Sequence, residues 1–506
     1  MGSKIKYSQL AFFLLSFAVI FSRFIFSRVE TQDIHDGFSL LYRISNAMVS
    51  VVCAISGIWI LRKILLCFFL DGIAALTMAL IVLGSNYFQL TAYDGAMPHN
   101  YLFTLYALIV WLTIRWHEIP RKKYAFSLGL AIGLAILVRP TSAVIILVPL
   151  LWGIADKESL QRKWILIKSN LSQVIFCILF LAAVAFLKIL SWKIQSSSFF
   201  FYSNEPDEEL LWIAPNLWQV LFSFKTGWFV YSPILIFSLI GFYFLADKNK
   251  AIFFATFLFF MVNLAVIASW PTWWYRDSLG QLALIESYVI LAIPFGYLLQ
   301  WMVLLKPLAR VAFFFVFLFF ILLNLFETWQ YMNFPIDPSN MTKEYYFLKQ
   351  TEKFNIRVLS NYDFEKNNFP ASDNLVTDIV KNGQYAYRMD TGIHFSPGLR
   401  SSYAELSEKS HLGIRVTAWI YTKVPYSENP GSLIVTSNHE GLNYHYETIS
   451  FDKENLKPGQ WNQVIMYYLA PESPDPKDII LVYVWFFGKK EMYIDDLKIE
   501  LFEPKE

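Results

Sequence analysis

Long apolar segments fill about the first two thirds of the chain, and short alternating segments fill the rest. A helix needs about 20 apolar residues to cross a hydrocarbon core of about 30 Å. By that measure the pattern predicts about eleven membrane-spanning helices. They cover residues 8–27, 46–66, 73–91, 99–116, 124–138, 140–156, 172–190, 227–246, 250–269, 279–302 and 308–330. The fifth and sixth meet at Arg139-Pro140, so this pair is either a hairpin or one re-entrant element.

From about Asn355 the apolar positions recur with the period of a strand. In residues 414–421 every second residue is apolar and small or β-branched, which predicts one buried face and one outward face. About eight to ten such segments, separated by turn residues, predict an antiparallel all-β sandwich. The expected organisation is a polytopic α-helical membrane domain at 1–334, a linker at 335–354 and a β-sandwich at 355–506.

The composition fits a membrane protein. Of the 506 residues, 56% are hydrophobic and 16% are charged, whereas soluble proteins carry about 25% charged residues. The 42 basic and 40 acidic residues nearly cancel, which argues against a protein that binds nucleic acid through an overall basic surface. The three cysteines lie in or beside apolar segments, so the sequence indicates neither a disulfide framework nor a cysteine metal site.

Basic residues beside the predicted helices indicate the orientation, because Lys and Arg gather in cytoplasmic loops. With the helices above, all the basic clusters fall on one side of the membrane. These clusters are Lys4 with Lys6, Arg62 with Lys63, Arg115 with Arg121, Lys122 and Lys123, Arg162 with Lys163 and Lys168, Lys248 with Lys250, and Lys306 with Arg310. We therefore expect the N-terminus in the cytoplasm and the β-sandwich outside.

Charged side chains at membrane depth are costly, and they indicate a function or a satisfied pair. The candidates lie in the predicted outer loops and at the outer helix ends. They are the acids Asp94, Asp36, Asp33 and Glu30 as catalytic groups, Arg139 and Arg276 as phosphate ligands, and His99, Trp273, Trp274, Tyr275 and Glu286 as substrate contacts. A carboxylate can act as a general base, and an arginine can hold a phosphate through two hydrogen bonds. The set fits transfer of a group from a lipid phosphate to a hydroxyl, with no obligatory metal or cofactor.

Structural explanations compete with these roles. Asp94 can cap the helix that follows it, and Arg139 can extend to the lipid headgroups. Aromatic residues at 273–275 can anchor the membrane interface, and the first-loop acids can simply be solvated. A transporter is a weaker alternative, because the sequence contains no inverted repeat.

The stretch from Asp36 to Trp274 resembles bacterial integral-membrane glycosyltransferases of the GT-C fold, related to protein O-mannosyltransferases and lipid A aminoarabinose transferases. Six segments carry the resemblance in matching order: DGFSLLYRISNAMVS, WILRKILL, LGSNYFQLTAYDGAMPHNYLFTLYALIVWLTIRWHE, LGLAIGLAILVRPTSAVIILVPLLWG, KTGWFVYSPILIFSLIG and WPTWWYRDSLGQLALIESYVILAIP. The resemblance implies inverting transfer of a sugar from a polyprenyl-phosphate donor to a glycan, lipid or protein acceptor, at the outer face of a bacterial inner membrane.

This sequence departs from that family at its beginning. Family members have a first span followed by an acidic outer loop that supplies the catalytic Asp or Glu, and we expect both to be missing here. Either Glu30, Asp33 or Asp36 substitutes, or the chain is a truncated relative, or it is an inactive relative that anchors a glycan-binding β-sandwich to the membrane.

The tail resembles jelly-roll carbohydrate-binding modules, through NYDFE, GIHFSPGLRSSYAEL, LKPGQWNQVIMYYLAP and KKEMYIDDLKIEL. The resemblance implies glycan binding on aromatic rings, with candidates Trp419, Trp461 and Trp485, although strand aromatics more often pack in a core. It also implies a structural calcium ion, for which Asp495, Asp496 and Glu365 would supply oxygen ligands. The alternative is that these acids are only solvated.

Overall fold

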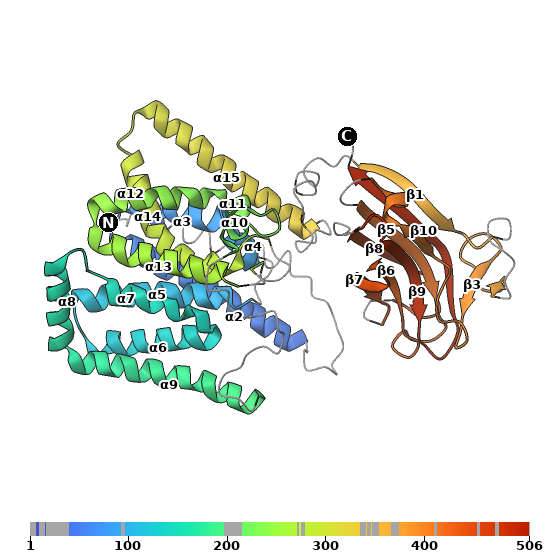
Figure 1. The fold of residues 1–506 in the computed structure, drawn as a ribbon, viewed down its shortest axis with the longest axis horizontal. Helices are drawn as coiled ribbons and strands as arrows, with labels where there is room; N and C mark the ends of the chain where they lie inside the picture. The colour runs from blue at the N-terminus through green and yellow to red at the C-terminus, as the bar shows by residue number, and fades with distance from the viewer. Residues whose placement is uncertain are drawn as a thin grey trace, which may run out of the picture. The chain divides into compact units, whose positions relative to one another are not determined.

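The computed structural model describes residues 7–9, 16, 40–92, 97–196, 215–270, 273–274, 279–333, 341, 346, 354–365, 374–408, 412–452, 456–470 and 475–504. The chain divides into two compact units, Met1–Ser339 and Asn340–Glu506 (Figure 1). The first is helical, and the second is built mainly of β-strands. Most of the predicted linker, 335–354, lies outside the described residues.

The helical unit contains α-helices and short 3-10 helices, marked η. In chain order they are α2 (Leu40–Leu65), α3 (Asp71–Leu83), α4 (Tyr87–Ala92), α5 (His99–Glu118), α6 (Lys122–Val138), η1 (Pro140–Ile146), α7 (Leu147–Leu151), α8 (Lys157–Ser169), α9 (Leu171–Ser196), α10 (Leu217–Phe222), α11 (Trp228–Tyr231), η2 (Pro233–Leu235), α12 (Ile236–Lys248), α13 (Lys250–Ala268), η3 (Leu282–Ser287), α14 (Tyr288–Met302) and α15 (Pro307–Asn333). Figure 1 shows α8 running across the ends of neighbouring helices, whereas α5, α6 and α9 lie side by side along the bundle.

The prediction of eleven membrane-spanning helices is not supported. Among the described residues, five helices are long and apolar enough to cross a membrane: Met48–Leu65, Leu171–Leu190, Lys250–Ala268, Leu282–Met302 and Pro307–Tyr331. Other predicted spans break into shorter elements, since apolar composition alone does not keep a helix continuous. Segment 73–91 divides into α3 and α4, and segment 227–246 is interrupted at Pro233, which begins η2. Segment 8–27 lies almost wholly outside the described residues.

The segments 124–138 and 140–156 form a hairpin. Helix α6 ends at Val138, and Arg139 adopts an extended backbone with φ −146° and ψ 117°. A residue before proline is disfavoured in the helical region, so Pro140 ends α6 and begins η1. Elements η1 and α7 then return to the end of the bundle where α6 began. Two contacts show this, since the ammonium of Lys163 bonds to the carbonyl of Trp152, just after α7, and contacts His117 in the last turn of α5.

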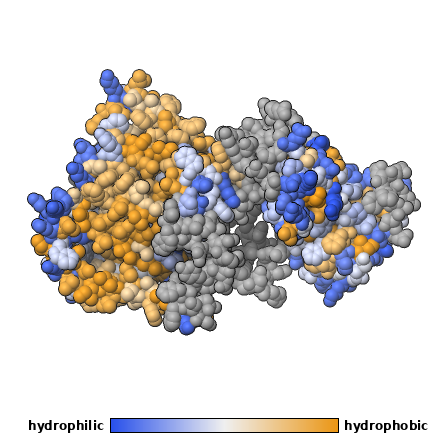
Figure 2. All heavy atoms as spheres, in the orientation of Figure 1, coloured by the Kyte–Doolittle hydropathy of each residue, from blue (hydrophilic) through white to orange (hydrophobic). Residues whose placement is uncertain are grey.

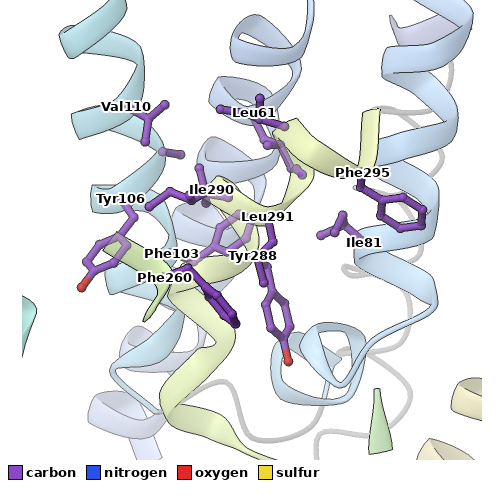
Figure 3. Close-up of a cluster of buried hydrophobic side chains, with 14 of the residues drawn as sticks. Leu61, Ile81, Phe103, Tyr106, Val110, Phe260, Tyr288, Ile290, Leu291 and Phe295 are labelled. Atoms are coloured by element: carbon purple, nitrogen blue, oxygen red, sulfur yellow. The ribbon is translucent and has the colours of Figure 1, made fainter. Parts of the chain in front are cut away.

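The core of the helical unit surrounds η3 and α14, and nearly all of Leu282–Met302 is buried. Figure 3 shows side chains from α2, α3, α5 and α13 packed around this segment, including Leu61, Ile81 and Phe103. Two other helices, α6 and α9, approach each other through Gly129, where an added Cβ would lie 2.2 Å from the carbonyl oxygen of Cys177. Figure 2 shows a broad apolar surface on this unit, as expected for a protein that faces lipid.

The β unit consists of two antiparallel sheets. Its elements are β1 (Phe354–Tyr362), β2 (Leu375–Val376), β3 (Ala386–Met389), β4 (Leu399–Ser402), α17 (Tyr403–Leu406), β5 (Leu412–Tyr421), β6 (Gly431–His439), β7 (Leu442–Ser450), β8 (Asn462–Ala470), β9 (Ile479–Phe486) and β10 (Met492–Pro504). The larger sheet has the order β2-β3-β10-β5-β8, with β1 also paired to β10, and the smaller sheet has the order β4-β9-β6-β7.

One hydrophobic core joins the two sheets. On β5, the residues Ile414, Val416, Ala418 and Ile420 are fully buried, and the residues between them are partly exposed. The alternation predicted for this strand is therefore confirmed. The smaller sheet contributes β6 and β9 side chains such as Val482 to the same core.

Candidate functional site

Three of the predicted site residues meet inside the helical unit. The guanidinium Nη1 of Arg139 donates a hydrogen bond to Oε1 of Glu286 at 2.9 Å, and Nδ1 of His99 lies 3.3 Å from Oε2 of the same carboxylate. The Glu286 side chain is 1% exposed, compared with 7% for His99 and 15% for Arg139. We call these three residues the Arg-Glu-His cluster.

Each member of the cluster occupies the end of an element. His99 is the first residue of α5, Arg139 follows the last residue of α6 at the tip of the hairpin, and Glu286 belongs to η3. The opposite ends of α5 and α6 carry Arg115 and Lys122. The cluster therefore lies at the end of the bundle away from these basic residues.

Burial of a carboxylate away from water is costly unless the charge is paired and hydrogen-bonded. Both oxygens of Glu286 are engaged, one by Arg139 and one by His99. A second donor of Arg139, Nε, bonds to the hydroxyl of Thr141 at 2.8 Å. The guanidinium is thus held in one orientation while part of its surface stays exposed. If His99 donates through Nδ1, its neutral ring presents Nε2 as an acceptor.

A second buried polar network, centred on Asn86, lies at the junction of η3 and α14. The side-chain oxygen of Asn86 accepts hydrogen bonds from the hydroxyls of Tyr288 (2.7 Å) and Ser232 (3.2 Å). The indole of Trp228 donates to the Tyr288 hydroxyl at 3.2 Å. Tyr288 follows Glu286 by two residues, so this network fixes the η3–α14 junction that carries the buried carboxylate. Sequence reasoning missed it, although an asparagine inside an apolar segment was an available signal.

The remaining candidates of the membrane half are only partly described. Trp273 is buried, and its carbonyl accepts a hydrogen bond from the amide of Gln281 at 2.9 Å. The ammonium of Lys225 lies 4.0 Å from the ring centroid of Trp274. The other candidates, Glu30, Asp33, Asp36, Asp94, Tyr275 and Arg276, lie outside the described residues.

The three predicted glycan-binding tryptophans do not share one surface. Trp419 lies on β5 of the larger sheet, with the ammonium of Lys381 4.3 Å from its ring centroid. Trp461 precedes β8 and contacts Tyr421 at a centroid distance of 5.6 Å. Trp485 lies on β9 of the smaller sheet, and 38% of it is exposed.

Around Trp485, outward-facing rings form a group that we call the aromatic face. The ring centroid of Trp485 lies 6.4 Å from that of Phe395 and 4.8 Å from that of Phe487. Tyr483, two residues earlier on β9, contacts Phe395 at 5.6 Å. The strand register places Tyr446 of β7 on the same side of the sheet. Alternation along the sequence VYVWFF was the signal that would have found these neighbours.

The three predicted calcium ligands accept hydrogen bonds from one loop. Asp495 is fully buried and accepts the backbone N–H groups of Lys381 (2.9 Å) and Asn382 (3.1 Å). The side chain of Asp496 also bonds to Asn382, and Glu365 accepts the N–H of Gln384 at 2.6 Å. Burial raises the pKa of the Asp495 carboxyl to about 6.

These hydrogen bonds anchor the loop at 381–384, and the structural calcium ion stays a prediction. Among the residues that the structure describes, no group of three His, Cys, Asp or Glu side chains forms a metal site.

Comparisons with known proteins assign the chain to no family. No protein-family model and no curated protein match the chain. Among solved structures, the chain is similar to "Family 16 Carbohydrate Binding Module-2", with 10% identity over 25% of this chain and 82% of that one, and a TM-score of 0.19. It is also similar to the CBM22-1 xylan-binding domain from Paenibacillus barcinonensis Xyn10C, with 12% identity over 31% of this chain and 89% of that one, and a TM-score of 0.19. The chain combines apolar helices long enough to cross a membrane with a unit built mainly of β-strands.

Proposed function

We propose that the protein is a glycosyltransferase of the GT-C kind in a bacterial inner membrane. It would transfer a sugar from a polyprenyl-phosphate donor to a glycan, lipid or protein acceptor at the outer face. The observation that carries this proposal is the Arg-Glu-His cluster, in which a buried carboxylate holds a partly exposed guanidinium at the end of the bundle away from the basic residues.

The reaction needs a cation for the leaving group and a base for the acceptor. An acceptor oxygen attacks the anomeric carbon, the new C–O bond forms, and the bond from carbon to phosphate oxygen breaks. Polyprenyl phosphate leaves with the electron pair, and a fixed cation stabilises its developing charge. Arg139 suits that role, because Glu286 orients it.

The proton of the acceptor hydroxyl passes to a base. Asp94 is our candidate, since it precedes His99 of the cluster by five residues. His99 is an alternative, since a neutral ring that donates to Glu286 offers its other nitrogen as an acceptor.

The aromatic face of the β unit supports a role in holding the acceptor or product glycan. Sugars stack on flat aromatic rings, and four such rings lie together at contact distances there. In this proposal the β unit is a jelly-roll module that retains glycan near the outer surface of the membrane.

The test is a transfer assay with purified full-length protein, a panel of polyprenyl-phosphate sugars and cell-envelope acceptors. Wild type should release polyprenyl phosphate and glycosylate an acceptor, and Asp94→Asn should abolish both. The matched control is Lys248→Gln, which changes a 70% exposed residue outside the cluster and should retain wild-type transfer. Wild-type protein that transfers no sugar, or Asp94→Asn that transfers normally, would contradict the proposal or its catalytic base.

The aromatic face also favours a second candidate, an inactive relative that anchors a glycan-binding module to the membrane. Both candidates predict glycan binding by the β unit, but only the first predicts turnover. Glycan binding without transfer from any donor of the panel would favour the second candidate.

A further inference from the structure

The end of the helical unit where α5 ends and α6 begins carries Arg115 and Lys122, and we call it the basic end. A cavity of about 490 Å³ lies there. The last turn of α5, the end of α7, α8 and the start of α13 contribute to its lining. The lining is amphipathic. It includes the apolar side chains of Phe68, Ile114 and Leu166, the basic or polar side chains of His117, Arg162 and Lys163, and one acid, Glu118, which is paired with Arg115. This mixture suits a ligand that has both a charged group and a hydrocarbon part.

Helix α8 beside this cavity buries one lysine and exposes several large apolar residues. Lys163 is buried, and its ammonium donates to the carbonyls of Pro149 and Trp152, both at 2.8 Å, and contacts His117. The exposed positions include large apolar residues. These are Leu160 (52% exposed), Trp164 (58%) and Ile165 (65%). Exposed apolar side chains of this size are explained if α8 lies in the interfacial region of a lipid bilayer.

The charge on α8 complements an anionic lipid. It carries Lys157, Arg162, Lys163 and Lys168 against a single acid, Glu158. The Arg162 side chain is 69% exposed. Its ion pair with Glu158 is long (3.5 Å), and the Glu158 side chain is 83% exposed. Such a pair contributes little stability, so the Arg162 guanidinium can turn to a phosphate at little cost. The hydrophilic end of the unit at α8 is visible in Figure 2.

We propose that α8 and the adjoining cavity bind the phosphate headgroup of an anionic phospholipid in the leaflet at the basic end of the bundle. Arg162 contacts the phosphate, and the apolar part of the lining takes the first carbons of the acyl chains. Lys163 is a positioning residue, because its ammonium is already engaged by two carbonyls and His117 and holds α8 against the bundle.

The experiment is native mass spectrometry of the full-length protein with phosphatidylglycerol, phosphatidylcholine, polyprenyl phosphate and inorganic phosphate. We expect phosphatidylglycerol to bind at least about tenfold more tightly than phosphatidylcholine. In Arg162→Gln this preference for phosphatidylglycerol should decrease about tenfold. The control Arg310→Gln removes the same charge from an exposed position at the basic end and outside the cavity lining, and should leave the preference unchanged.

Three results would overturn the proposal. Equal loss in Arg162→Gln and Arg310→Gln would mean that only the overall positive charge attracts the lipid. Inorganic phosphate or polyprenyl phosphate that displaces phosphatidylglycerol at equal concentration would assign the site to a different ligand. Equal binding of phosphatidylcholine would exclude selection by headgroup charge. The readout is lipid binding, so it is independent of glycosyl transfer.

Discussion

Glu286 and Arg139 form a buried ion pair in the helical unit, with side chains that are 1% and 15% exposed. Removal of one partner of a buried pair leaves an uncompensated charge, which costs about 3–5 kcal/mol. We expect Glu286→Gln to lower the free energy of unfolding by about that amount. In a double-mutant cycle with Arg139→Gln, thermal unfolding in detergent should show a coupling energy of about 1–3 kcal/mol.

The matched control for this cycle is the exposed pair Arg115–Glu118, whose side chains are 41% and 48% accessible. Such pairs contribute about 0–1 kcal/mol. A coupling energy for Glu286 and Arg139 no larger than that of the control pair would show that the buried contact is not structurally important.

Asp495 predicts a pH dependence for the β unit. Burial raises the pKa of its carboxyl to about 6 in the folded state, whereas the unfolded chain keeps an ordinary value near 4. The folded state therefore binds the proton more tightly, so this contribution to stability is present below about pH 4 and is lost as pH rises through about 6. Denaturant unfolding of residues 340–506 should show this loss in wild type and a smaller one in Asp495→Asn. Equal pH profiles for the two proteins would contradict the assignment.

At the scale of elements, the contact of α6 with α9 depends on Gly129. A Cβ there would lie 2.2 Å from the Cys177 carbonyl oxygen, so the helices would have to separate. We expect Gly129→Ala to destabilise the helical unit by about 1–3 kcal/mol. The control Gly72→Ala in α3 meets no atom within 4 Å and should be neutral, or stabilising by up to about 1 kcal/mol. Thermal unfolding that ranks the two variants in the opposite order would contradict the close packing.

The aromatic face predicts which tryptophan of the β unit binds glycan. Trp485 has one stacked and one tilted aromatic neighbour and an accessible ring, whereas Trp419 lies on the other sheet beside Lys381. On a glycan array, Trp485→Ala should weaken binding at least about tenfold, as for a central contact residue. Trp419→Ala should bind as wild type does. Loss of binding in Trp419→Ala alone would place the binding surface on the larger sheet.

The elements also show what a sequence can predict. Strand alternation in β5 identified its buried residues correctly, because a strand has a fixed period and both sheets bury one face. The predicted number of eleven spanning helices is not supported among the described residues, because apolar composition continues through breaks such as Pro233 and Ser85–Asn86 that divide a segment into short helices. Segment length and hydropathy therefore overestimate the number of continuous spanning helices in the described part of this chain.

At the scale of the whole molecule, the sequence identified Arg139, His99 and Glu286 individually, since charge at membrane depth is costly. It did not predict that one carboxylate binds both partners, because residues 99 and 286 are brought together only by the packing of α5 on η3. The Asn86 network was missed for the same reason: its hydrogen bonds join segments more than a hundred residues apart.

The most direct test of the account is the rate at which purified full-length protein releases polyprenyl phosphate from a polyprenyl-phosphate sugar in the presence of an acceptor. We expect turnover by wild type and by Lys248→Gln, and a decrease of at least about 100-fold in Arg139→Gln, because the leaving phosphate loses its fixed cation. Folding of the Arg139 variant is checked by its unfolding temperature. Wild-type turnover that persists unchanged in a folded Arg139→Gln protein would contradict the central role of the Arg-Glu-His cluster.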